Sequence, residues 1–124
     1  MLQCLALAKK GIGKVSPNPM VGSIVVYKNK IIGKGYHEKY GSNHAEVNAI
    51  NSVKNKALLS QSTLYVNLEP CSHHGNTPPC CEFIVKNKIK TVVIGCLDSS
   101  AKVNGKGIEF LKNNGVEVIT DVLK

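Results

Sequence analysis

Residues 70–81 have the sequence Pro-Cys-Ser-His-His-Gly-Asn-Thr-Pro-Pro-Cys-Cys. These twelve residues contain three cysteines, two histidines and three prolines, together with a single glycine. Thiolate sulfur and imidazole nitrogen are the usual protein ligands of zinc, and each proline restricts the backbone around it. We therefore expect a stiff loop that holds a metal ion, with the rest of the chain as its scaffold.

A further ligand is expected from the segment His44-Ala45-Glu46, in which His44 lies 27 residues before Cys71 and 36 before Cys80. The ligands His44, Cys71 and Cys80 would leave the fourth position of a tetrahedral zinc ion open to water, as in catalytic sites. Zinc lowers the pKa of such a water to about 7, which makes hydroxide available near neutral pH. Glu46 is close enough to carry protons to and from that water as a general acid/base.

Apolar periodicity and turn residues predict an α/β fold. Helices are expected at residues 2–10, 44–56, 80–88 and 105–113, and strands at 23–27, 31–36, 63–68, 91–96 and 116–120. Helices that alternate with strands after an initial hairpin imply a five-stranded mixed sheet covered on both faces. The chain shows no internal repeat and no linker, so residues 1–124 are expected to form one domain.

Two of the expected helices carry specific predictions. The apolar face of the first helix should comprise Leu2, Leu5, Ala6 and Ala8, and the inward face of the second Ala49, Ile50 and Val53. Asn43 is a suitable N-cap for the second helix, which would put Glu46 at the N3 position of a capping box. His44 and Glu46 would then both lie in the first turn of this helix.

The charge pattern argues against a nucleic-acid partner. The formal net charge is +8, but all sixteen basic residues are lysines scattered along the chain. Arginine, the usual residue for bidentate contacts with phosphate or guanine, is absent from the sequence. No apolar run approaches the ~18 residues of a membrane span, and the N-terminus lacks the charge order of a secretory signal. We therefore expect a cytoplasmic protein with neither a nucleic-acid nor a membrane partner.

The five cysteines fall into two groups. Cys71, Cys80 and Cys81 cluster, which in a cytosolic chain favours metal binding over a disulfide. Cys4 and Cys96 lie in apolar segments and are interpreted as small buried hydrophobic residues.

The alternative to catalysis is a closed structural zinc site, with Cys81, His73 or His74 as the fourth ligand. Glu46 would then be only a helix-capping residue, and the protein a non-catalytic, zinc-stabilised binding module. Against this, His-x-Glu followed by Pro-Cys-x-x-Cys is the signature of zinc deaminases. The sequence matches it at 44–46 and 70–71, but eight residues rather than two separate Cys71 from Cys80. Cys81, one step round the helix from Cys80, is expected to point into the core.

The chain resembles the deaminase domain of the bifunctional riboflavin-biosynthesis deaminase/reductase over nearly its whole length. The matching stretches are Ser-Pro-Asn-Pro-Met-Val-Gly at 16–22, Gly-x-Gly-Tyr-His at 33–37, His-Ala-Glu at 44–46, Leu-Glu-Pro-Cys-Ser-His at 68–73, Thr-Pro-Pro-Cys at 77–80 and Val-x-Gly-x-Gly at 103–107. The resemblance implies a three-layer α/β/α fold of the cytidine deaminase type. It also implies hydrolytic deamination of 2,5-diamino-6-(5-phosphoribosylamino)pyrimidin-4(3H)-one to 5-amino-6-(5-phosphoribosylamino)uracil and ammonia. Another nucleotide or tRNA adenosine is the alternative substrate within the superfamily.

On this resemblance Zn²⁺ is held by His44, Cys71 and Cys80, and Glu46 is the proton shuttle. The substrate contacts that it implies are Asn18, His37, His73, Asn76, Asp98 and Ser100. Two of these positions depart from the family pattern, since Asn76 replaces a basic residue and Ser100 an asparagine. Lys102 is a candidate for the missing positive charge. The family's reductase domain is absent from these 124 residues, so we expect a separate reductase chain or a longer protein, and we expect a homo-oligomer.

Overall fold

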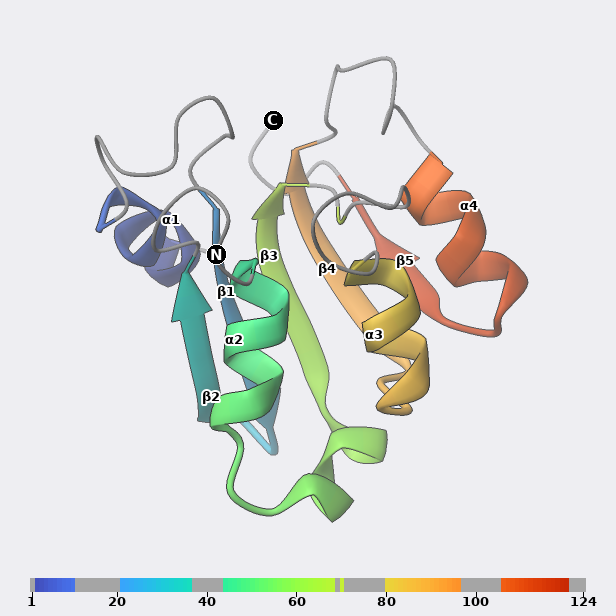
Figure 1. Ribbon diagram of the computed structural model, residues 1–124, viewed down its shortest axis with the longest axis horizontal. Coiled ribbons are helices and arrows are strands. Elements are labelled where there is room, and N and C mark those ends of the chain that lie inside the picture. The colour runs from blue at the N-terminus through green and yellow to red at the C-terminus, as the bar shows by residue number, and fades with distance from the viewer. Residues whose placement is uncertain are drawn as a thin grey trace.

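The computed structural model of the chain describes residues 2–10, 21–36, 44–68, 70, 80–96 and 106–120. Within these ranges the chain forms four α-helices, one 3₁₀ helix and five strands (Figure 1). In chain order the elements are α1 (Leu2–Lys9), β1 (Gly22–Tyr27), β2 (Lys30–Tyr36), α2 (Ala45–Ser52), η1 (Lys56–Gln61), β3 (Thr63–Leu68), α3 (Cys80–Lys86), β4 (Thr91–Cys96), α4 (Lys106–Asn113) and β5 (Glu117–Ile119).

The strands form one five-stranded sheet in the order β2-β1-β3-β4-β5. Strand β1 pairs antiparallel with both β2 and β3, whereas β3, β4 and β5 run parallel to one another. The hairpin between β1 and β2 turns at Lys28 and Asn29, whose φ values of 48° and 65° fit a two-residue turn matched to the strand twist. The prediction of a mixed five-stranded sheet is therefore confirmed.

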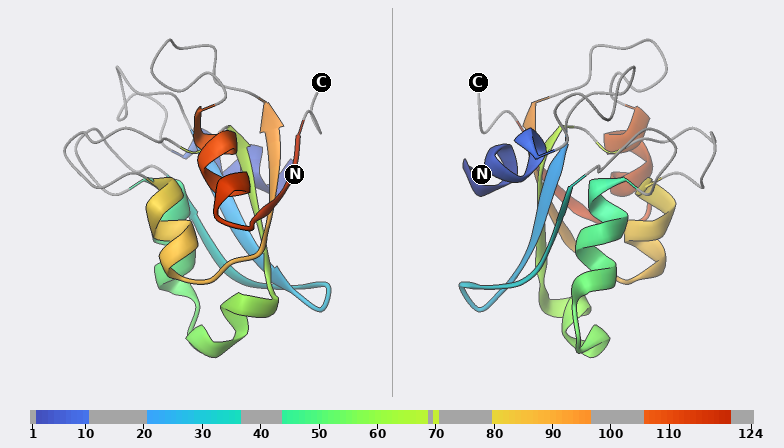
Figure 2. Two further views of the ribbon diagram at one scale, coloured as in Figure 1. Left: turned by 90° about the vertical axis from the view of Figure 1, so that its right-hand side faces the viewer. Right: turned by 60° about the vertical axis from the view of Figure 1, so that its left-hand side comes forward.

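Helices cover both faces of this sheet. Helices α2, α3 and α4 lie on one face, and α1 lies on the other, as the two turned views in Figure 2 show. Each parallel crossover, from β3 to β4 and from β4 to β5, contains a helix, as parallel pairing requires. The expected three-layer α/β/α arrangement is confirmed.

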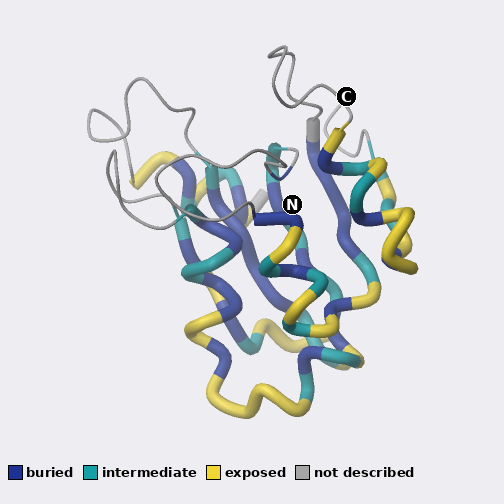
Figure 3. Tube along the Cα trace, turned by 45° about the vertical axis from the view of Figure 1, so that its right-hand side comes forward, coloured by how far each residue is buried: buried dark blue, intermediate teal, exposed yellow. Residues whose placement is uncertain are grey.

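The core lies between the sheet and the layer formed by α2, α3 and α4. Apolar residues from all three helices, from β1, β3 and β4 and from η1 form one buried cluster; it comprises Val25, Ala49, Ile50, Val53, Leu59, Leu64, Val66, Cys81, Ile84, Ile89, Val92, Ile94, Leu111 and Val116. The inward face predicted for the second helix is thus correct. Figure 3 shows buried positions along the central strands and exposed ones on the outer sides of the helices.

Helix α1 buries only part of the predicted face, and Cys4, predicted to be buried, belongs to the buried face as well. Cys4 and Ala8 are buried, whereas Ala6 is exposed and Leu5 is only half-buried. The reason lies in Gly22 at the start of β1, where an added Cβ would come within 2.0 Å of the Cys4 carbonyl oxygen. Because the backbones approach so closely, small residues rather than leucines face the sheet.

Helix α2 is shorter than predicted and begins one residue later. Its N-cap is His44 in extended conformation, and it ends at Ser52 rather than at residue 56. The Ser52 hydroxyl donates to the Ala49 carbonyl (2.7 Å), and Val53 leaves the helical conformation with ψ 123°. The prediction of Asn43 as N-cap is therefore wrong, and Glu46 is the second helical residue instead of the N3 residue of a capping box.

Helices α3 and α4 end in the same motif. The amide of Ile89 donates to the Ile84 carbonyl (3.4 Å), and the amide of Val116 donates to the Leu111 carbonyl (3.0 Å). In each case the preceding residue has a left-handed conformation, with φ 65° at Lys88 and φ 83° at Gly115. This is the Schellman pattern, which satisfies the last carbonyls of a helix with its own backbone.

Other boundaries differ from prediction by a few residues. Helix α3 ends at Lys86 rather than at residue 88, because the Schellman turn takes the next two residues. Strand β5 comprises only Glu117–Ile119, since it pairs on one side only and its ladder with β4 has three residue pairs. No helix in the described ranges has the length and apolar character to cross a membrane.

Candidate active site

Two predicted ligands that are far apart in sequence meet at the starts of two helices. His44 is the N-cap residue of α2, and Cys80 is the first residue of α3. The Nδ1 atom of His44 lies 3.2 Å from the Sγ atom of Cys80. Cys80 is 1% exposed, while His44 is half-buried. The imidazole and the thiol therefore share a small space beyond one end of the strands, where α2 and α3 begin.

This pair fits a shared zinc ion. Zinc binds imidazole nitrogen at about 2.0–2.1 Å and cysteine sulfur at about 2.3 Å, so a tetrahedral angle puts the two ligand atoms about 3.5 Å apart. The observed separation of 3.2 Å is close to that value. Among the residues that the structure describes, His44 and Cys80 are the predicted ligands that can be placed, because Cys71 lies outside the described ranges.

Glu46 is the third candidate residue that the structure describes here, and it is buried. Its carboxyl side chain is 4% exposed and belongs to the first turn of α2, two residues after His44. The amide groups in the first turn of a helix have no intrahelical acceptor, and their partial positive charge favours anions. The starts of α2 and α3 thus offer a suitable setting for a carboxylate and a thiolate.

The two adjacent cysteines of α3 have different environments. Cys81 is fully buried in the core, where its Sγ lies 3.5 Å from the carbonyl oxygens of both Pro70 and Gly107. These contacts join the start of α3 to Pro70, two residues after the end of β3, and to the first turn of α4. The prediction that Cys81 points into the core is confirmed, which weakens the alternative that it is a fourth metal ligand.

Cys4 also lies near this end of the strands but has the chemistry of a buried thiol. The pKa of the Cys4 thiol is raised from 9.0 to about 11, chiefly by burial; the positive charge of the N-terminus and a hydrogen bond with the Ile24 backbone oppose this rise, and the Glu46 carboxylate adds slightly to it. Cys4 therefore stays protonated at neutral pH, in agreement with its interpretation as a small core residue. The side chain of Cys96 lies outside the described part of the structure.

Most of the other predicted site residues lie outside the described ranges. They are Asn18, His37, Cys71, His73, Asn76, Asp98 and Ser100, together with Lys102 and the alternative ligand His74. Three described residues mark where these segments start. Tyr36 immediately precedes His37, Pro70 immediately precedes Cys71, and β4 ends at Cys96. Their predicted roles remain predictions.

Two asparagines near the site were missed from the sequence. Asn48 donates through Nδ2 to the Tyr36 carbonyl (2.9 Å), and the Oδ1 atom of Asn67 accepts from the amide of Gly22 (2.7 Å). Each side chain joins two segments that lead into predicted site loops. The available signal was spacing, since Asn48 follows His44 by four residues and so lies on the same side of the helix.

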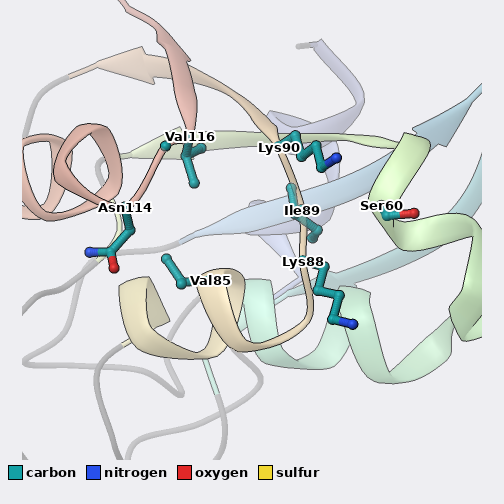
Figure 4. Close-up of a pocket in the computed structure, with 8 residues that line it drawn as sticks. Ser60, Val85, Lys88, Ile89, Lys90, Asn114 and Val116 are labelled. Atoms are coloured by element: carbon teal, nitrogen blue, oxygen red, sulfur yellow. The ribbon is translucent and has the colours of Figure 1, made fainter.

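A hollow of about 290 Å³ lies beyond the opposite ends of the strands, between the last residues of α3 and α4 (Figure 4). It is lined by Ser60, Val85, Lys88, Ile89, Lys90, Asn114, Gly115 and Val116. Lys90 and Val116 directly precede β4 and β5, so the hollow adjoins the amino ends of the parallel strands. In open α/β sheets ligands bind outside the carboxyl ends. The lining here consists mainly of two Schellman turns and has no group of metal-ligating residues.

Comparison with known proteins identifies close relatives. Residues 1–96 match the family model described as the cytidine and deoxycytidylate deaminase zinc-binding region. The chain is 48% identical over 118 residues to diaminohydroxyphosphoribosylamino-pyrimidine deaminase of Buchnera aphidicola subsp. Schizaphis graminum, covering 95% of this chain and 79% of that protein. It is 51% identical over 118 residues to riboflavin biosynthesis protein RibD of Aquifex aeolicus, covering 95% of this chain and 33% of that protein.

A solved structure gives the same result for the fold. The diaminohydroxyphosphoribosylaminopyrimidine deaminase/5-amino-6-(5-phosphoribosylamino)uracil reductase of Thermotoga maritima matches with a TM-score of 0.91 and 50% identity. The match covers 99% of this chain and 35% of that one. The chain thus spans about a third of the two longer relatives and most of the shorter one.

Proposed function

Since this chain belongs to the family of the cytidine and deoxycytidylate deaminase zinc-binding region, we propose that it is a zinc-dependent hydrolase that deaminates a pyrimidine. The substrate is 2,5-diamino-6-(5-phosphoribosylamino)pyrimidin-4(3H)-one, and the reaction is an early step of riboflavin biosynthesis. The identity to a deaminase of that name over 95% of the chain supports this choice. The observation that carries the proposal is the contact between His44 and Cys80, with Glu46 buried in the same helical turn.

The proposed reaction exchanges the exocyclic amine for oxygen. Water supplies the oxygen, the bond between the ring carbon and the exocyclic amino nitrogen breaks, and ammonia leaves, so that the product is 5-amino-6-(5-phosphoribosylamino)uracil. When bound, zinc supplies the Lewis acidity that makes water a nucleophile near neutral pH. His44, Cys71 and Cys80 would hold the ion, and the donor set of one imidazole and two thiolates is typical of the zinc deaminases.

Glu46 acts as the proton carrier in this proposal. Its carboxylate takes a proton from the attacking water and delivers it to the departing amine, which cannot leave readily as an amide anion. Burial of Glu46 excludes bulk water from this exchange. Because the side chain is in the first turn of α2, the same backbone segment that positions His44 also fixes the distance between the carboxylate and the reacting atoms.

The substrate contacts follow the same proposal. Asn18, His37 and His73 would meet the pyrimidine edge and the ribose phosphate through amide and imidazole groups. The product would pass to a reductase, carried on another chain or on another part of a longer protein. This reaction requires no nucleic acid, and the names of the relatives reported above describe enzymes that act on small molecules.

The test measures ammonia release by the purified, zinc-loaded protein. The diaminopyrimidine phosphate is compared with cytidine, deoxycytidylate and tRNA at equal concentration. We expect release from the diaminopyrimidine phosphate at a kcat/KM at least about tenfold above that for any other compound. Release only from one of the others would replace the proposed substrate. Release from none would leave a zinc-binding module.

A further inference from the structure

Helix α2 lies directly on the edge strand β2. An added Cβ at Gly33 would come within 2.5 Å of the Ala49 carbonyl oxygen, and one at Gly35 within 2.5 Å of the Ala49 amide nitrogen. Backbone therefore meets backbone at both positions, and any side chain on these glycines would lift the helix from the strand. The Gly-x-Gly pattern at 33–35 fixes the height of α2 above the sheet.

Two hydrogen bonds fix where α2 lies along β2. Asn48 Nδ2 donates to the Tyr36 carbonyl (2.9 Å), and the Lys34 amide donates to the Ser52 hydroxyl (2.9 Å). β2 is an edge strand, so one side of its backbone has no neighbouring strand, and both of these bonds join its backbone to side chains of α2. The two anchoring residues are one helical turn apart on α2. Each provides one side-chain hydrogen bond to the same strand.

The two anchors differ in what lies next to them. The backbone amide of Asn48 donates to the His44 carbonyl (3.1 Å). Asn48 therefore closes the first turn of α2, which contains Glu46. Through its side chain Asn48 also bonds Tyr36, which is the last residue of β2 and directly precedes His37. Ser52, by contrast, is the last residue of α2, at the end away from His44.

We propose that Asn48 is a positioning residue of the active site. By holding the first turn of α2 to the end of β2, it keeps His44 against Cys80 and fixes the position of the turn that carries Glu46. It also ties this turn to the strand that leads into His37. Direct hydrogen-bond partners of metal ligands are typically worth ~10–100-fold in metal affinity or activity, and Asn48, which acts through the backbone, is expected at the lower end of that range. The proposal rests on the deaminase function proposed above.

Asn48→Ala and Ser52→Ala make a matched pair for the test, because each removes one side-chain hydrogen bond between α2 and β2; Ser52→Ala also removes the bond from its hydroxyl to the Ala49 carbonyl, so it is the more demanding control for stability. We expect similar drops in the melting temperature of the two zinc-free proteins. Zinc affinity, measured by competition with a chelator, should weaken ~10-fold or more in Asn48→Ala and by less than about twofold in Ser52→Ala. The kcat should fall by a similar factor in Asn48→Ala alone, with a smaller change in KM.

Two further variants separate the hydrogen bond from the volume of the side chain. Asn48→Leu keeps the approximate volume and removes the donor, so it should resemble Asn48→Ala, whereas Asn48→Gln keeps an amide donor and should recover part of the zinc affinity. Equal losses of zinc affinity in Asn48→Ala and Ser52→Ala would overturn the proposal, as would wild-type affinity in Asn48→Leu. Zinc binding is measured without substrate, so an inactive wild type would refute the deaminase function but leave this comparison intact.

Discussion

The two ends of the helices that cover the core differ in the backbone groups that they present. At one end α2 begins after His44 and α3 begins at Cys80, and their amide groups have no acceptor within the helix. At the other end α3 and α4 finish in Schellman turns, in which their own backbone satisfies the last carbonyls. Both ends have polar side chains, and the second end has the hollow of Figure 4.

This difference explains why the candidate chemistry lies at only one end. Amide groups without an acceptor in their own helix and the positive end of the helix dipole favour a thiolate and a carboxylate, and there the sequence places Cys80 and Glu46. At the other end Lys88 and Lys90 adjoin the helix carbonyl ends, where lysine suits the dipole without forming a site. Figure 4 shows both lysine side chains extending away from Asn114. Chain polarity, rather than the presence of a hollow, marks the end that carries the candidate active site.

The largest expected effect contrasts one carboxylate from each end. Glu46→Gln should lower kcat by ~10³-fold or more, because general acid/base catalysis is worth ~10²–10⁴-fold, while bound zinc is retained. Glu117→Gln, at the exposed start of β5 on the other side, should stay within about twofold of wild type. Steady-state ammonia release and metal analysis measure both quantities. A fully active Glu46→Gln protein would remove Glu46 from the mechanism.

The next effect separates the two neighbouring cysteines of α3. Cys80→Ser should weaken zinc binding by more than ~100-fold, because it removes a ligand. Loss of a group that only hydrogen-bonds to a ligand already costs ~10–100-fold in metal affinity. Cys81→Ala should keep its zinc but lose about 1–2 kcal/mol of unfolding free energy, because its thiol fills the core beside Pro70 and Gly107. Chelator competition and urea unfolding distinguish the two. Loss of zinc in Cys81→Ala would favour the closed structural site.

A smaller effect concerns Cys4, the buried thiol near the functional end. Its pKa is about 11 in the folded protein and 9.0 as the reference value, so the protonated thiol is favoured by folding. This contribution is complete below pH 9 and is lost as the pH rises through about 11. The unfolding free energy of wild type should therefore fall by on the order of 1–2 kcal/mol more than that of Cys4→Ala between pH 8 and pH 10.5. Parallel pH profiles for the two proteins would contradict the burial of this thiol.

The smallest effect is expected at the Schellman turns, where stability should change without any change in activity. Lys88→Gly should raise the unfolding free energy by up to about 1 kcal/mol, because a left-handed conformation costs a residue with a Cβ. Gly115→Ala should lower the unfolding free energy by about 1 kcal/mol, because Gly115 has a left-handed conformation with φ 83°. No steric clash adds to this loss, since an added Cβ would meet no other atom within 4 Å. Thermal unfolding and ammonia release check both. Reduced kcat in either variant would show that this end contributes to the reaction.

Much of the fold could be predicted from local pattern. Strands β3 and β4 have the predicted boundaries, and the inward face of α2 is correct, because apolar periodicity over a strand or helix reports burial directly. The ends of helices were less predictable. Helix α2 stops at Ser52, whose hydroxyl donates to the Ala49 carbonyl and accepts from the backbone amide of Lys34 in β2. The second of these bonds depends on a residue 18 positions earlier in the chain.

The candidate site could be predicted only as a set of residue types. The sequence alone supplied His44, Glu46 and the cysteines of the 70–81 segment, since metal ligands and a general acid/base are chemically distinctive. It also supplied the family resemblance, which the comparisons bear out. The sequence could not show which of the four apolar residues proposed for α1 face the sheet. That choice depends on the close contact with Gly22, which favours the small residues Cys4 and Ala8 over leucine.

The 70–81 segment determined by itself that this protein should bind a metal, because its ligand density follows from side-chain chemistry alone. Only the tertiary structure decided which neighbours act together. It brings Cys80 to His44 across 36 residues, turns Cys81 into the core, and gives Asn48 a backbone partner on β2. These outcomes depend on how helices seat on the sheet, and that seating is set by contacts between segments that no local pattern records.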